Sequence, residues 1–243
     1  MSTESANVSG YSKYNPEAAR RRRQNPLEDL YPALPHEEYD IVYADPPWDY
    51  GGKMQYDKTS IKSENVGFTK DVFISSASFK YPTLNVRELK TLDVGSIAAP
   101  DSLLFMWTTG PQLKNSIDVG THWGFDYKTV AFVWDKMIHN PGQYTLSQTE
   151  FCLVMKKGRI PKPRGVRNIR QFVQAPRSKH SEKPQTVQEG VTTMFPEQRK
   201  IELFARDVVS GWANWGLDVL DGSANNLKEA EHCNLLVPTE LPR

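Results

Sequence analysis

The sequence has few cysteines and no long apolar run. Its 243 residues include two cysteines, Cys152 and Cys233, which are too few for a disulfide framework and favour a reducing compartment. No apolar stretch approaches the length of a membrane span, and no secretory segment follows Met1. We therefore expect neither a membrane partner nor export.

Two kinds of binding motif are also missing. No cysteine and histidine cluster has zinc-ligand spacing, so we expect no metal site. No glycine-rich phosphate-binding loop is present either. Cys152 lies inside the apolar stretch Phe151–Met155, which predicts a small buried side chain and not a catalytic thiol.

Net charge is almost absent, but positive charge is clustered. The formal net charge is +1 at pH 7. One basic cluster covers Arg20 to Arg23. A second contains Lys156, Lys157, Arg159, Lys162, Arg164, Arg167 and Arg170, and continues with Arg177 and Lys179. Basic stripes on a neutral protein are typical of contact with a phosphate backbone, although a solvated loop or an acidic partner protein also fits.

The length and the apolar content of 38% indicate one domain with a real core. We place this domain at residues 27–222, after a flexible basic arm at 1–26 and before a polar tail at 223–243. Residues 51–80 form a long polar stretch with little periodicity. Because long loops in compact domains are usually functional, we interpret this stretch as a lid.

Apolar periodicity predicts an α/β fold. The predicted strands are 39–44, 102–107, 129–134, 151–156, 171–173, 200–204 and 217–220. The predicted helices are 85–92, 111–123 with Leu113, Ile117 and Thr121 inward, and 184–194 with Pro184 as first helical residue. Strands that alternate with helices imply a mostly parallel sheet with helices on both faces.

The most informative stretch is Asp45-Pro46-Pro47-Trp48, directly after the first predicted strand. The prolines fix φ and remove two backbone donors, so the loop offers acceptors. A planar ring with an exocyclic amine suits such a loop, because the amine can donate to Asp45 and to the Pro46 carbonyl. The ring can stack on Trp48, and Tyr50 offers a second aromatic surface.

This motif resembles motif IV of the amino-methyltransferases. With tryptophan in the last place, it is similar to the adenosine methyltransferase family named after the 70-kDa catalytic subunit of the mRNA enzyme, which has bacterial and phage DNA members. The resemblance implies S-adenosylmethionine as cofactor and the exocyclic amine of adenine as target. It also implies a Rossmann-like, seven-stranded methyltransferase fold in the permuted (class beta) order, with the catalytic tetrad first and the cofactor strand last.

Three further segments carry the resemblance. Ser178 to Pro184 resembles the family's His-Ser-x-Lys-Pro element, which implies that Lys183 binds the methionine carboxylate and leaves His180 as a loop-ordering residue or a ligand. Arg199 to Arg206 resembles Arg-Lys-Ile-Glu-Leu-Phe-x-Arg and implies that Arg206 lies near the ribose. In the third segment, Gly211 to Asp218, Leu217 replaces the family's asparagine, and Asp218 replaces its glutamate or glutamine as ribose partner.

The resemblance also bears on the substrate. Tyr81 belongs to an element like the family's Tyr-Pro/Gly-Thr-Met and is a candidate for the base pocket, whereas we interpret Trp107 as core. The basic residues from Lys156 to Arg167 are candidates for nucleic-acid contacts, with DNA favoured over RNA. A homodimer or a pair with a homologous subunit is implied, in the cytoplasm of a bacterial or phage-infected cell, or in the nucleus of a eukaryotic one.

Other functions remain open at the level of sequence. A non-catalytic nucleic-acid-binding subunit would keep the fold, and the altered Leu217 is compatible with it. An RNA adenosine methyltransferase has the same motifs. A cytosine-amine methyltransferase is disfavoured, because those enzymes typically carry serine where Asp45 stands.

Overall fold

The computed structural model describes residues 27, 31–50, 83–140, 144–177, 182–217 and 219. The expected arm at 1–26, the expected lid at 51–80 and the expected tail at 223–243 lie outside these residues. Among the described helices, none combines the length and apolarity that crossing a bilayer requires.

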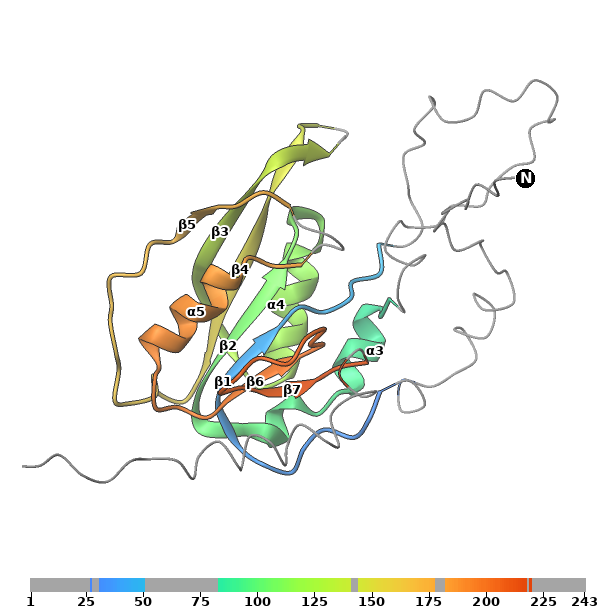
Figure 1. The fold of residues 1–243 in the computed structure, drawn as a ribbon. Coiled ribbons are helices and arrows are strands. Elements are labelled where there is room, and N and C mark those ends of the chain that lie inside the picture. Colours follow the sequence, from blue (N-terminus) through green and yellow to red (C-terminus); the bar gives the residue numbers. More distant parts are fainter. Residues whose placement is uncertain are drawn as a thin grey trace, which may run out of the picture.

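Within the described residues, seven strands form one sheet in the order β5-β3-β4-β2-β1-β6-β7 (Figure 1). The strands are β1 (Tyr39–Ala44), β2 (Ala98–Thr108), β3 (Asp126–Asn140), β4 (Ser147–Lys157), β5 (Phe172–Gln174), β6 (Lys200–Leu203) and β7 (Ala213–Trp215). Only β4 runs antiparallel to its neighbours, β2 and β3, while the other pairs are parallel. The predicted mostly parallel seven-stranded α/β sheet is confirmed.

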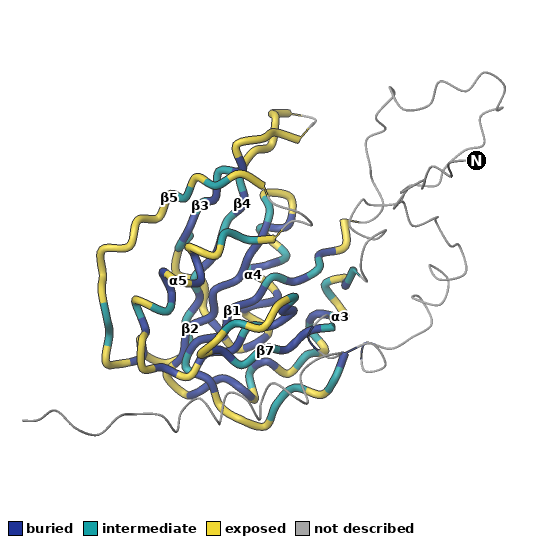
Figure 2. Tube along the Cα trace, viewed as in Figure 1, coloured by how far each residue is buried: buried dark blue, intermediate teal, exposed yellow. Residues whose placement is uncertain are grey.

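Helices cover both faces of the sheet, because the central strands are apolar on both sides (Figure 2). Along β1, Val42 and Ala44 pack into one core cluster, and Ile41 and Tyr43 pack into the other. The first cluster includes residues of α3 (Val86–Thr91) and α4 (Leu113–His122), and the second includes residues of α5 (Gln185–Met194). Cys152 lies fully buried in the second cluster, as expected, and burial raises the pKa of its thiol well above the ordinary value.

Local sequence explains the short helices. Asn85 caps α3 by accepting from the backbone N–H groups of Arg87 and Glu88, and Glu88 accepts from the Asn85 N–H in return. A 3-10 turn at Gly110–Gln112 precedes α4. The inward face of α4 consists of Ser116, Val119 and Gly120. The prediction of Thr121 as an inward residue was wrong, since it is exposed.

Three other predictions differ from the structure. Among the described residues the last strand is β7 at Ala213–Trp215, because Ala213 to Trp215 pair with Ile201 to Leu203 of β6; of the predicted strand 217–220, only residues 217 and 219 are described, and neither belongs to a strand. Pro184 is the N-cap of α5 and not its first helical residue. Strands β3 and β4 extend well beyond 129–134 and 151–156, because they form a long hairpin whose far part has no apolar periodicity.

The chain order places a crevice at β1. From β1 the chain builds the sheet toward β5 on one side and then returns to add β6 and β7 on the other. Ligands of open α/β sheets bind where the strand order reverses in this way, at the carboxyl ends of the strands. Asp45 directly follows β1 and therefore lies at this point.

Candidate active site

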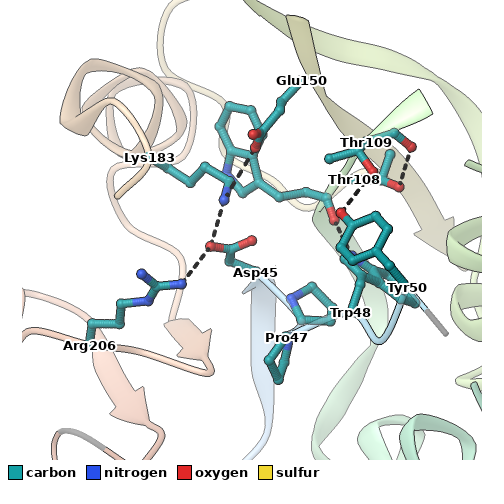
Figure 3. Close-up of a pocket in the computed structure, with 11 residues that line it drawn as sticks. Asp45, Pro47, Trp48, Tyr50, Thr108, Thr109, Glu150, Lys183 and Arg206 are labelled. Carbon is teal, nitrogen blue, oxygen red and sulfur yellow. Dashed lines mark hydrogen bonds and ion pairs between the residues drawn. The ribbon is translucent and has the colours of Figure 1, made fainter. Parts of the chain in front are cut away.

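A pocket lies at the carboxyl ends of β1, β2 and β6 (Figure 3). Its walls come from the loop after β1, the end of β2, the start of β4, the residue before the α5 cap and the loop after β6. The lining residues are Asp45, Pro46, Pro47, Trp48, Tyr50, Trp107, Thr108, Thr109, Glu150, Lys183 and Arg206. The structure thus brings together seven residues that the sequence nominated, from three segments far apart in the chain.

The Asp45 carboxylate lies beside two cationic side chains, those of Lys183 and Arg206. Its Oδ2 lies 2.7 Å from the Lys183 ammonium and 3.8 Å from a terminal nitrogen of Arg206. The Asp45 side chain is 18% exposed, so the carboxylate remains reachable from the pocket. A carboxylate oxygen that faces two cations and remains partly open to the pocket is suited to accept hydrogen bonds from an amine.

Glu150 is a site residue that sequence reasoning missed. Its Oε2 lies 3.4 Å from the Lys183 ammonium, and its Oε1 lies 3.4 Å from the ammonium of Lys136. Two cations and two carboxylates therefore alternate from Lys136 through Glu150 and Lys183 to Asp45. In the sequence, Glu150 is visible only as an acid directly before the apolar stretch Phe151–Met155. Because β4 runs antiparallel to β2, the start of β4 lies beside the carboxyl end of β2, and this places Glu150 at the pocket.

Lys183 remains charged despite its burial. Burial disfavours the ammonium, but the carboxylates of Asp45 and Glu150 outweigh it and raise the pKa of Lys183 above its ordinary value. The ammonium also lies 5.6 Å from the ring centroid of Trp107, within cation–π range. A fixed cation at this place can bind an anionic group of a ligand.

Backbone hydrogen bonds fix the loop after β1. The Trp48 N–H donates to the Pro46 carbonyl at 2.8 Å, so this carbonyl already has one partner inside the loop. The Leu84 N–H donates to the Pro47 carbonyl, and the Asp49 N–H donates to the Leu84 carbonyl. Both proline carbonyls therefore help to hold the loop, and a ligand amine would use the second lone pair of the Pro46 oxygen.

Trp48 is mainly a core residue. It is 5% exposed, belongs to the core cluster beneath α3 and α4, and donates from its indole nitrogen to the Trp107 carbonyl at 3.2 Å. Tyr50 is 37% exposed, and its hydroxyl lies 2.9 Å from the Thr109 hydroxyl. Tyr50 therefore offers the pocket more aromatic surface than Trp48 does.

Trp107 combines two roles. It is fully buried, which confirms its interpretation as core, and its indole nitrogen donates to the Tyr43 hydroxyl at 2.6 Å. Yet it also lines the pocket beside Thr108 and Thr109 at the end of β2. The pocket wall at Trp107 is therefore part of the core itself.

The structure does not bring the basic residues to the pocket. Lys157 pairs with Ser102 at the opposite end of β2, roughly 20 Å from Thr108 along an extended strand. Its ammonium donates to the carbonyls of Gly95 and Ala98. Lys156, Arg159 and Lys162 lie at this far end or just after it, and Arg164 lies with its guanidinium 5.3 Å from the Phe195 ring centroid. Arg167 is exposed on the loop that leads to β5.

Other nominated residues lie outside the described part of the chain. These are Tyr81, His180 and Asp218. Leu217, which stands where the family pattern has asparagine, is described and packs against the core cluster of α3 and α4.

Glu202 makes the stability of the fold depend on pH. Burial raises its pKa from an ordinary 4.5 to about 7, and the charges of Asp45 and Asp207 add to this rise, although a hydrogen bond from Gln188 opposes it. Between these two values the folded chain holds a proton that the unfolded chain has lost, so stability falls as the pH rises. We expect Glu202→Gln to show a smaller fall in unfolding free energy between about pH 5 and pH 8 in urea titrations.

The matched control for Glu202 is Glu189→Gln, because Glu189 is an exposed acid on the same α5 that carries Gln188. This control should keep the wild-type pH slope. Equal slopes for wild type and Glu202→Gln would contradict the assignment.

Comparison with known proteins agrees with this geometry. The MT-A70 family model matches residues 39–218. The Type II methyltransferase M.MunI of a Mycoplasma species is 64% identical over 214 residues, which are 88% of this chain and 92% of that protein. The mouse N(6)-adenine-specific methyltransferase METTL4 is 24% identical over 201 residues, which are 75% of this chain and 38% of that protein.

A plant relative is similarly distant. The N(6)-adenosine-methyltransferase MT-A70-like protein of Arabidopsis thaliana is 28% identical over 190 residues, or 73% of this chain and 23% of that protein. The chain thus spans less than half the length of these two eukaryotic relatives. Because the family model covers most of the chain and M.MunI aligns over nearly its whole length, the chain is a methyltransferase of the MT-A70 family.

Proposed function

We propose that this methyltransferase uses S-adenosylmethionine to methylate the exocyclic amine of adenine in DNA. The observation that carries the proposal is the Asp45 carboxylate, which is fixed at the carboxyl end of β1 and faces a pocket with cations on one side and aromatic rings on the other. DNA is favoured over RNA because the 64% identical relative is a Type II methyltransferase, whereas relatives named for adenosine or RNA are 23–28% identical.

Asp45 is the group that recognises and activates the amine. An adenine amine is a weak nucleophile, because its lone pair is delocalised into the ring. When Asp45 accepts one N–H and the Pro46 carbonyl accepts the other, the nitrogen becomes pyramidal and its lone pair is freed. The carboxylate would stabilise the positive charge that develops on nitrogen as it takes the methyl group, whose bond to the cofactor sulfur would break with the electron pair remaining on sulfur. The proton would then leave the methylated nitrogen to solvent water, so no base with a shifted pKa is required.

The residues present fit the cofactor. Lys183 is a buried cation directly before the α5 N-cap and would bind the methionine carboxylate. Arg206 follows β6 and would lie near the ribose, and Asp218 is a further candidate for a ribose hydroxyl. When bound, S-adenosylmethionine supplies an electrophilic methyl group on sulfur. Asp45 then also serves the cofactor, since it orients Lys183 through the 2.7 Å ion pair.

Aromatic stacking on the adenine is assigned mainly to Tyr50. The extruded base must lose its stacking neighbours, at a cost of a few kcal/mol. A tyrosine that is 37% exposed at the pocket mouth can recover part of this cost, by about 1–3 kcal/mol. Trp48 contributes the edge that lines the pocket, while most of its surface is packed in the core.

The basic residues would contact DNA away from the target base. A separation of roughly 20 Å between Lys157 and the end of β2 corresponds to about six base pairs of a duplex. Exposed basic residues such as Lys162 and Arg167 would therefore contact phosphates and position the duplex without reading the target base.

A methyl-transfer assay tests the proposed function. The chain is incubated with S-adenosylmethionine labelled on the methyl group and with unmethylated duplex DNA, the same DNA as single strands, or RNA of the same sequence. We expect label in DNA, recovered as N6-methyladenine after digestion, and none in a duplex that lacks adenine. Label in cytosine would overturn the assignment of the target base, and label in RNA alone would overturn the choice of DNA.

The alternative of a non-catalytic nucleic-acid-binding subunit would show a different result. Such a chain would bind DNA but transfer no methyl group to any of these substrates. The Asp45 carboxylate and the Lys183 ion pair argue against it, because a largely buried network of charges that lines a pocket at the switch point is typical of a catalytic site.

A further inference from the structure

The hairpin of β3 and β4 projects past the pocket edge of the sheet, at the top of Figure 1. Its described residues run from Lys136 to Asn140 and from Tyr144 to Thr149. The exposed apolar side chains on this projection are Met137 at 61%, Ile138 at 54%, Tyr144 at 95% and Leu146 at 61%. Apolar side chains that gather on one exposed projection mark a contact surface.

Irregular backbone geometry in the hairpin directs these side chains outward. The pairing of β3 with β4 is irregular between Asp135 and Asn140, and Met137 has a φ of 57°. This left-handed conformation is unfavourable for a residue with a Cβ. Asp135 holds it in place by accepting from the Met137 N–H at 2.9 Å and from the Gln148 side chain at 2.6 Å. Such irregularities next to active sites commonly re-aim a side chain.

The base of the hairpin is joined to the pocket. Lys136, the residue before Met137, forms an ion pair with Glu150, and Glu150 lines the pocket and pairs with Lys183. Leu146 is four residues from Glu150, which is at most about 13 Å of extended chain. The base of the hairpin therefore lies beside the pocket.

We propose that this hairpin enters the DNA next to the target adenine, and that Met137 and Ile138 separate the neighbouring base pair and occupy the space that the extruded base leaves. The proposal rests on the proposed function. Methionine, isoleucine and leucine are typical of the apolar wedges that proteins insert between base steps. A two-stranded ribbon also fits the dimensions of a DNA groove.

The hairpin carries no acidic side chain that would repel a polyanionic partner. The sequence contains no aspartate or glutamate from Lys136 to Thr149. A surface that docked a second copy of this chain would need about 800 Å² on each partner, which four side chains on a narrow ribbon cannot supply by themselves. DNA is therefore the occupant that the hairpin favours.

The test compares Met137→Ser/Ile138→Ser with a control, Tyr127→Ser/Phe172→Ser. The control removes two apolar side chains that are 39% and 56% exposed, one at the other end of β3 and one on the edge strand β5. Each protein is assayed on duplex DNA whose methylated adenine has been mapped, and on the same duplex with an abasic site opposite that adenine. The abasic site makes extrusion easier without changing the pocket.

We expect the hairpin variant to lose about tenfold or more in kcat/KM on the intact duplex and to recover to within about threefold of wild type on the abasic duplex. The control should match wild type on both. Unchanged activity of the hairpin variant, or an equal loss on both substrates, would overturn the proposal. A change from dimer to monomer in light scattering would overturn it in favour of a second copy as the partner. If the wild-type chain methylates no nucleic acid, the proposed function itself fails and the hairpin proposal falls with it.

Discussion

Asp45→Asn is expected to lower kcat for methyl transfer by about 10²–10³-fold while the fold is retained. The substitution keeps the shape of the side chain and one acceptor oxygen, but it removes the negative charge on which the mechanism depends. Stability should change little, because Lys183 retains Glu150 as a partner. The measurement is single-turnover methyl transfer at saturating cofactor, combined with urea denaturation to verify folding.

The control for Asp45→Asn is Asp49→Asn. Asp49 is an exposed acid in the same loop, four residues along the chain, and does not line the pocket. This variant should keep near-wild-type activity. An Asp45→Asn variant that transfers methyl groups at a rate close to wild type would exclude Asp45 as the group that activates the amine.

Lys183→Met should weaken cofactor binding by about a hundredfold. The variant removes the cation that lies between the carboxylates of Asp45 and Glu150, and with it the group that we propose binds the methionine carboxylate at the start of α5. The two acids would then face the anionic end of the cofactor without the lysine between them. Calorimetric titration with S-adenosylmethionine, or with its demethylated product, measures the loss without any need for DNA.

A substitution of a second buried lysine, Lys200, serves as a control that distinguishes an effect on cofactor binding from an effect on stability. Lys200 is 6% exposed and donates to the carbonyls of Pro196 and Gln198, far from the lining of the pocket. Lys200→Met should lower the unfolding free energy but leave the dissociation constant of the cofactor unchanged. Equal losses of affinity in both variants would mean that Lys183 acts only through the stability of the fold.

Much of the fold could be predicted because its signals are local. The apolar run of β1, the capping residue Asn85 and the segment of β6 each specify an element within a few residues. Errors arose where pairing decides the element. The strand β7 forms at Ala213–Trp215 because β6 offers its edge there, although 217–220 has the stronger apolar pattern.

In the candidate site, too, local features could be predicted and features that depend on tertiary packing could not. Trp48 was predicted as the stacking platform because of its place in the tetrad, but the structure leaves only 5% of it exposed and assigns more aromatic surface to Tyr50. Exposure of a side chain is set by the elements packed around it, and these come from distant parts of the sequence. For the same reason the basic residues near Lys157 could not be placed relative to Asp45 before the sheet order was known.

The sequence by itself predicted the residues to which our proposal assigns the chemistry: an acid at a strand end, two prolines that fix its loop and a lysine before a helix. These features are local, because φ restriction, strand patterning and helix capping act over a few residues. Only the tertiary structure decided that Lys183 reaches Asp45 across 138 residues of chain, that Glu150 joins them, and that the β3–β4 hairpin projects beside the pocket. These facts depend on strand order and strand direction, which are set by the packing of the whole core.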